Sequence, residues 1–173
     1  MRIRTETPED VQAVREVTAA AFGSADEAGL VDALRADASW IPGLSLVAED
    51  DDGEIIGHCL YTRASIGDTP AILLTPVSVA PGHQNRGIGG ALIRQGLEAA
   101  EAMGERFALV LGHPGYYPRF GFEQASAHRV TCTLSAGPGE GAMVMSLDGG
   151  PIPAGDMGFS GPMAEAVSAY RPE

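Results

Sequence analysis

The sequence predicts a mixed α/β (α+β) domain built around one central sheet. Three observations favour this fold class. Short apolar runs of strand length recur along the chain, three segments have helical periodicity, and Asp, Gly and Pro residues separate these elements. The expected order is strand, two helices, several antiparallel strands, helix, strand, short helix and two strands, which is typical of helices packed on a single sheet.

The first elements carry clear start signals. Arg2–Glu6 is expected to be a strand, and Thr7 is expected to cap a helix that has proline at its first position. Ser24 and Glu27 have the spacing of a capping box, which predicts a second helix that runs to about Asp37.

The middle of the chain predicts strands. Leu44–Glu49 and Glu54–Ala64 flank the run Asp50-Asp51-Asp52-Gly53, and the Asp-Gly pair indicates a hairpin. Ala71–Val79 is a third apolar strand. Pro76 interrupts it, and because proline donates no ladder hydrogen bond we expect a bulge or an unpaired stretch there.

The second half predicts one long helix and shorter elements. Apolar residues line the helix over Gly87–Met103, and Gly104 is expected to end it. The expected elements that follow are a buried strand at Phe107–Leu111, an aromatic turn at His113–Phe122, an antiparallel pair at Arg129–Ser135 and Ala142–Leu147, and one short helix at Pro162–Tyr170.

Length and composition limit the domain organisation and the location. The 173 residues suit one domain, so we expect a single domain over 1–173 with a Gly/Pro-rich tail from about residue 148. The N-terminus holds no apolar leader, and no run approaches the roughly 18 apolar residues of a membrane span. We therefore expect a cytoplasmic protein that has no membrane partner.

Charge and cysteine usage exclude other classes. The net charge of −12 argues against nucleic acid as a partner, because a duplex binder needs a basic surface. Cys59 and Cys132 lie far apart, and we expect both to be reduced residues in strands. The four histidines show no metal-ligand spacing, so we expect no metal.

The stretch after the third strand is typical of a phosphate-binding turn. A buried strand ends at Val79, a loop follows, and a helix begins among three glycines. The first amide groups of a helix have no intrahelical acceptor, and glycines let an anion approach them closely. Arg86 adds a positive charge. The turn lacks the Gly-Lys-Ser/Thr ending of a P-loop, and the first strand is not followed by GxGxxG.

This turn resembles the signature of the GNAT superfamily of N-acetyltransferases. Gln84-x-x-Gly87-x-Gly89 is similar to the family's Q/R-x-x-G-x-G/A motif, and Val-x-Val-x-Pro precedes it as the family's cofactor strand does. The resemblance implies a mostly antiparallel sheet, flanked by helices and splayed at the cofactor strand, which would account for Pro76. It also implies acetyl-CoA as co-substrate. The implied cofactor-binding residues are Val77, Val79, Gln84, Asn85, Arg86, Gly87, Ile88, Gly89 and Gly90.

The aromatic turn resembles the family's second mark, a tyrosine four residues before Gly-Phe. The resemblance implies that Tyr117 is the general acid that protonates the departing CoA thiolate, and Pro-Arg-Phe-Gly-Phe resembles the YhbS-like branch. The alternative is that Tyr117 belongs to a packed aromatic lid.

The general base is left open. Many members of the family place a glutamate on the strand before the turn, but residues 71–80 contain no acid or histidine. His113, Glu27 and a water held by Thr75 or Ser78 are the candidates.

These observations predict direct acetyl transfer from acetyl-CoA to a primary amine. The alternatives are a non-catalytic acyl-CoA-binding or sensor domain of the same fold, and a nucleotide-binding domain unrelated to CoA. The acceptor is open between a small amine and a peptide or protein amine, and a homodimer is common in the resembled family.

Overall fold

The computed structural model describes residues 1–135, 139–159 and 161–169. The chain forms two units, the first from Met1–Tyr61 and Thr75–Ala99, the second from Thr62–Leu74 and the described part of Ala100–Glu173. Three elements pass from one unit into the other: β3 (Ile55–Ile66), β4 (Thr69–Val79) and α3 (Ile88–Ala102).

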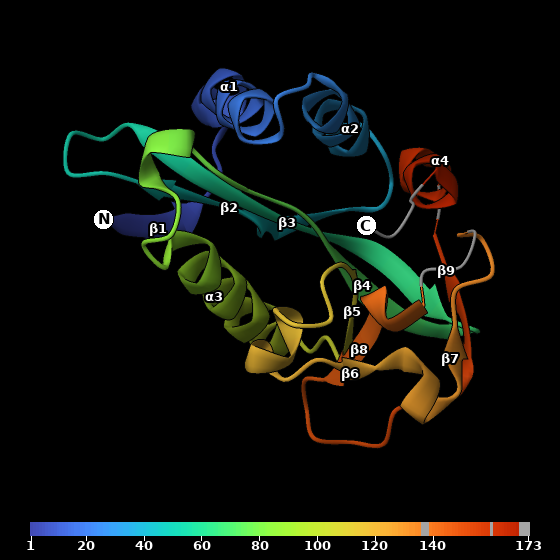
Figure 1. Ribbon diagram of the computed structural model, residues 1–173. Coiled ribbons are helices and arrows are strands. Elements are labelled where there is room, and N and C mark those ends of the chain that lie inside the picture. The colour runs from blue at the N-terminus through green and yellow to red at the C-terminus, as the bar shows by residue number, and fades with distance from the viewer. Residues whose placement is uncertain (136–138, 160, 170–173) are drawn as a thin grey trace. The chain divides into compact units, whose positions relative to one another are not determined.

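The first unit contains a four-strand ladder with helices on both faces. Its further elements are β1 (Arg2–Thr5), a 3-10 turn (Pro8–Asp10), α1 (Val11–Phe22), α2 (Asp26–Arg35), β2 (Trp40–Glu49) and a 3-10 turn (Pro81–His83). The strand order is β1-β2-β3-β4, and β1 is antiparallel to β2. Figure 1 shows α1 and α2 side by side on one face of these strands and α3 on the other.

The predicted hairpin between β2 and β3 is confirmed. The Asp50 Oδ1 atom accepts hydrogen bonds from the amides of Asp52 and Glu54, each at 2.9 Å. Gly53 has φ +82°, a left-handed conformation that favours glycine. Hydrogen bonds and a glycine within the local sequence therefore stabilise the turn.

The helix starts follow from local polar contacts. The Asp10 carboxylate accepts from the Thr7 amide at 2.7 Å and also takes a bidentate pair of bonds from Arg4, at 2.7 and 2.9 Å. Ser24 Oγ accepts from the Asp26 amide at 3.1 Å, but the predicted capping box is wrong. The helix begins at Asp26 with Ala25 as its N-cap and has no side-chain cap bond, and the Oε2 atom of Glu27 is buried without a hydrogen-bond partner among the described residues.

Close packing of α3 against β3 fixes the helix in the first unit. The Tyr61 hydroxyl donates to the Ile93 carbonyl at 2.8 Å, and both Tyr61 and Gly96 are buried. A Cβ at Gly96 would lie 2.3 Å from Cε2 of Tyr61, so only glycine permits this approach.

The second unit is mainly antiparallel. Its further elements are β5 (Phe107–Leu111), β6 (Glu123–Gln124), β7 (Val130–Thr131), β8 (Ala142–Ser146), β9 (Gly155–Gly158), α4 (Gly161–Ala169) and three 3-10 turns (Tyr117–Phe120, Ala125–His128, Gly139–Gly141). β8 pairs antiparallel with β5 and β6, and β9 pairs antiparallel with the end of β3. Parallel pairs join β4 to β5 and β7 to β9. The chain thus has the predicted mixed α+β fold with mostly antiparallel strands.

The predicted antiparallel pair of Arg129–Ser135 with Ala142–Leu147 is wrong. The apolar β8 pairs with the buried β5, whereas only Val130–Thr131 is extended in the other segment and pairs with β9. Arg129 has φ +55°, which ends the extended backbone on that side. The short helix predicted over Pro162–Tyr170 is observed as α4, and Tyr170 lies outside the described residues.

Both cysteines are free and buried. Cys59 lies in β3, whereas Cys132 follows the end of β7 rather than lying in a strand. Burial raises the pKa of the Cys59 thiol far above its ordinary value, and burial also raises that of Cys132.

Candidate functional site

The turn between β4 and α3 has the backbone that an anion site requires. Asn85 has φ +62° and Gly87 has φ +80°, so two left-handed residues reverse the chain just before the helix begins at Ile88. A Cβ at Gly87 would have no atom within 4 Å, and Gly87 is exposed. The turn therefore presents open space directly in front of the helix.

The first amides of α3 follow directly after the turn. The Ala91 amide donates to the Gly87 carbonyl at 3.0 Å, at the first turn of α3. The amides of Ile88, Gly89 and Gly90 precede it and have no acceptor within the helix. Together with the positive end of the helix dipole they form an acceptor site for a phosphate group.

Gln84 holds the loop to the preceding strand. Its side-chain amide donates to the Val79 carbonyl at 3.1 Å, which ties the turn to the end of β4. Arg86 is exposed in the same turn. The predicted residues from Gln84 to Gly90 thus lie in the turn and in the first residues of α3.

The last residues of β4 alternate in burial. Val77 and Val79 are half-buried, whereas Pro76, which precedes Val77, and Ser78, which lies between the two valines, are buried. The peptide bond between Thr75 and Pro76 is cis. Ser78 Oγ lies 3.5 Å from Thr18 Oγ1 of α1, so the serine faces the α1 side of the strand.

The aromatic turn lies in the second unit. Tyr117 begins a 3-10 turn, is half-buried, and meets Tyr116 and Phe122 edge to face with centroids 5.0 and 6.0 Å away. A Cβ at Gly112 would lie 2.4 Å from Cε2 of Tyr117, so the Tyr117 ring can occupy this position only because residue 112 has no side chain. The amide of Tyr117 donates to the carbonyl of His113 at 3.4 Å.

The two side chains named as candidate bases lie in different units. Glu27 is on α2 in the first unit and His113 follows β5 in the second. His113 is exposed, and Glu27 is half-buried.

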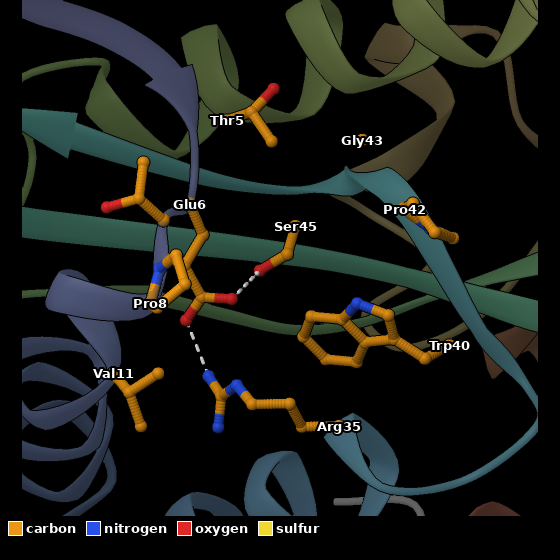
Figure 2. Close-up of a pocket in the computed structure, with 10 residues that line it drawn as sticks. Thr5, Glu6, Pro8, Val11, Arg35, Trp40, Pro42, Gly43 and Ser45 are labelled. Carbon is orange, nitrogen blue, oxygen red and sulfur yellow. Dashed lines mark hydrogen bonds and ion pairs between the residues drawn. The ribbon is translucent and has the colours of Figure 1, made fainter.

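Sequence reasoning missed a polar cluster beside α2. Ser45 Oγ donates to Glu6 Oε2 at 3.0 Å and lies 2.8 Å from His58 Nε2, and Arg35 donates to Glu6 Oε1 at 2.5 Å. Figure 2 shows Glu6 between Ser45 and Arg35, with the Trp40 ring alongside. No local motif predicts this cluster, since Glu6 follows β1 and the other members come from β2, β3 and α2.

The cluster opens into a pocket of about 400 Å³. Its lining residues are Thr5, Glu6, Thr7, Pro8, Val11, Arg35, Trp40, Pro42, Gly43 and Ser45. His58 contacts Ser45 and is fully buried; burial, with a smaller contribution from the charge of Arg35, lowers the pKa of the imidazole to about 3. His58 is therefore neutral at physiological pH.

The described residues hold neither a metal-binding cluster nor a membrane-spanning helix. Across the described ranges, no group of three or more His, Cys, Asp and Glu side chains is arranged to hold a metal ion. No helix in the described part of the chain combines the length and apolar character of a membrane span.

Similarity to known proteins agrees with the turn and the fold. Residues 2–125 match the model of the acetyltransferase (GNAT) domain. The uncharacterized N-acetyltransferase YjhQ of Escherichia coli K12 is 44% identical over 124 residues, covering 69% of this chain and 68% of YjhQ. YhbS of the same strain, also an uncharacterized N-acetyltransferase, is 33% identical over 134 residues, covering 76% and 79% of the two chains.

Two solved structures are similar over most of the chain. A GNAT family acetyltransferase from Brucella melitensis in complex with acetyl-CoA has a TM-score of 0.78 at 36% identity, with 94% of this chain and 97% of that chain covered. Escherichia coli YhbS in complex with CoA has a TM-score of 0.83 at 28% identity, with 94% and 91% covered. The chain belongs to the GNAT family of N-acetyltransferases, and its relatives include YhbS and YjhQ.

Proposed function

We propose that this protein transfers the acetyl group of acetyl-CoA directly to a primary amine, as a single catalytic domain over 1–173. The observation that carries the proposal is the turn before α3, where left-handed Asn85 and Gly87 precede three amides without intrahelical acceptors. The acetyl-CoA and CoA complexes of the two solved relatives support the choice of cofactor.

The pyrophosphate of CoA is assigned to this turn. The amides from Gly87 to Gly90 would donate to its oxygens, and Arg86 would add charge, while Gln84 and Asn85 hold the loop. Each hydrogen bond to a charged acceptor contributes about 1.5–3 kcal/mol, so a few of them account for micromolar affinity.

The pantetheine arm is assigned to the backbone of Val77 and Val79 at the end of β4, where the family resemblance implies a splayed strand. In this assignment a backbone amide near Val77 polarises the thioester carbonyl, and Tyr117 protonates the departing sulfur. His113, Glu27 and a bound water stay as candidates for the base. A homodimer and the cytoplasmic location also stay predictions.

Calorimetric titration with acetyl-CoA, using ATP and NAD as controls, tests the cofactor assignment. Gly87→Glu places a carboxylate in front of the amides and should weaken acetyl-CoA binding at least 100-fold. Gly53→Glu is the matched control, because Gly53 has φ +82° against +80° for Gly87 and has equally open surroundings. Equal weakening in both variants, or no acetyl-CoA binding by the unmodified protein, would refute the assignment.

Turnover tests the catalytic part. A panel of primary amines, including polyamines, an aminoglycoside and a lysine peptide, is screened for CoA release. Tyr117→Phe should lower kcat about 100-fold while the Kd for acetyl-CoA stays within twofold. Unchanged kcat would remove Tyr117 from the mechanism. Binding of acetyl-CoA without any turnover would favour the non-catalytic binding domain instead.

A further inference from the structure

A chain of three side chains crosses neighbouring strands of the first unit. Glu6 follows β1, Ser45 lies in β2 and His58 lies in β3. Ser45 Oγ is 3.0 Å from Glu6 Oε2 and 2.8 Å from His58 Nε2, and the Glu6 side chain is only 5% exposed. Polar groups are rarely buried together without a structural or chemical reason.

The positions of the hydrogens on these three side chains follow from which of their atoms can donate a hydrogen bond. An ionised Glu6 carboxylate only accepts, so the Ser45 hydroxyl must donate to it. The Ser45 oxygen then accepts from His58, which places the single proton of the neutral ring on Nε2. The other ring nitrogen, Nδ1, carries a lone pair, and it is buried with no hydrogen-bond partner among the described residues.

Nδ1, the unpartnered nitrogen, belongs to His58, which lies opposite β4. The Ala80 amide donates to the Ile56 carbonyl at 2.9 Å, and the antiparallel register set by this bond places His58 across from Ser78. Both residues are buried, and directly opposite Cβ atoms lie about 4.5–5.5 Å apart. Ser78 lies between Val77 and Val79, the residues assigned to pantetheine.

The Glu6 end of this series of three side chains reaches solvent. Glu6 lines the pocket of about 400 Å³, where Arg35 holds its second oxygen (Figure 2). The three side chains thus connect the interior beside β4 with an open pocket, and each link is within hydrogen-bond distance.

We propose that His58, Ser45 and Glu6 form a proton relay that carries the proton released by acetyl transfer from the Ser78 side of β4 to the pocket. The proposal rests on the proposed acetyltransferase function. An alkylammonium acceptor gives up two protons as its nitrogen becomes an amide. It loses the first to solvent when it enters the site as the neutral amine, and the second leaves the nitrogen as the C–N bond forms and the C–S bond breaks. The departing sulfur takes a proton from Tyr117, which regains one from solvent, so the relay carries the second nitrogen proton and the net release is one proton per turnover.

The relay moves that proton in balanced steps. A water held by Ser78 takes it from the acceptor nitrogen and passes it to Nδ1 of His58. The Nε2 proton moves to Ser45, and the Ser45 proton moves to Glu6, which releases it to solvent in the pocket. The relay resets when His58 returns to its Nε2–H tautomer. These proton transfers give the reaction a proton acceptor, which β4 itself lacks.

The tautomer gives a test that needs no acceptor. In protein with ¹⁵N-labelled histidine, two-bond ¹H–¹⁵N couplings identify which nitrogen of each ring is protonated, and His58→Gln assigns the signal. We expect the neutral Nε2–H form at pH 7. The Nδ1–H form would overturn the relay, because the proton could then not enter at Nδ1.

Turnover variants test transfer through the chain, with acetyl-CoA and either the best amine from the screen or water as acceptor. His58→Gln keeps a side-chain amide that can donate to Ser45 but cannot relay a proton. Both His58→Gln and Ser45→Ala should lower kcat at least 10-fold and leave the Kd for acetyl-CoA within twofold. Ser45→Thr, which restores the hydroxyl, should recover most of the rate.

Thr62→Val is the matched control, because Thr62 is also a buried β3 residue whose hydroxyl has no partner among the described residues. It should leave kcat unchanged. Wild-type kcat in a folded His58→Gln variant would overturn the relay and leave the acetyltransferase proposal standing. Failure of the unmodified protein to bind acetyl-CoA would refute both.

Discussion

Lowering the pH from 7.5 to 5.0 should remove roughly 2 kcal/mol of folding free energy through His58 alone. Burial lowers the pKa of this imidazole from 6.5 in the unfolded chain to about 3 in the folded protein. Between these two values the unfolded chain binds a proton that the folded chain does not, so stability falls as the pH falls. The loss is about 1.36 kcal/mol for each pH unit below the unfolded pKa of 6.5, and pH 5.0 lies 1.5 units below that value.

Urea unfolding of the unmodified protein and of His58→Gln at the two pH values measures this contribution. Taking the pH difference within each protein cancels any constant effect of the substitution on stability. The free energy of unfolding of the unmodified protein should fall by roughly 2 kcal/mol more than that of the variant. An equal fall in both proteins would mean that His58 is not buried in neutral form, and the assigned tautomer would lose its basis.

Three further substitutions have defined outcomes. Gly96→Ala should destabilise the protein by about 1–3 kcal/mol in urea unfolding, since the new Cβ would lie 2.3 Å from the Tyr61 ring; unchanged stability would show that α3 can shift. Asp10→Asn should lower the free energy of unfolding at pH 7 by roughly 2–3 kcal/mol, because an amide cannot replace the carboxylate that binds Arg4 in bidentate fashion; this loss should begin to shrink only below about pH 4 and should fade as the pH drops further toward the strongly lowered pKa of Asp10. Gly112→Ala should displace the ring of the proposed acid and reduce kcat with little change in acetyl-CoA Kd; a normal kcat would count against that ring's role.

Features set by nearby residues were predictable from the sequence. The Asp50–Gly53 hairpin and the turn at Gln84–Gly90 depend on left-handed residues and on side chains a few positions away, so their signals are local. The long helix over Gly87–Met103 was predicted to within a residue of α3 at each end. The predicted phosphate turn could therefore be located before its geometry was known.

Features set by distant residues were not predictable. Ser45 meets Glu6 across 39 positions and His58 across 13, and each of these residues alone fits an ordinary strand. β9 has the sequence Gly-Asp-Met-Gly, which lacks the β-branched residues that mark strands, and it pairs because Asp156 accepts from Thr131 and Thr133. Such pairings are decided by tertiary contacts, which spacing along the chain does not encode.

The buried thiols have a practical consequence for measuring activity. A chromogenic disulfide reacts with thiolates, and free CoA supplies an exposed thiol in every turnover. Cys59 is shielded from both solvent and ionisation, and Cys132 is 7% exposed, so the folded enzyme should contribute little background. CoA release can then be followed continuously in the presence of intact protein. A sudden rise in reagent consumption at two equivalents per chain would report unfolding in the same cuvette.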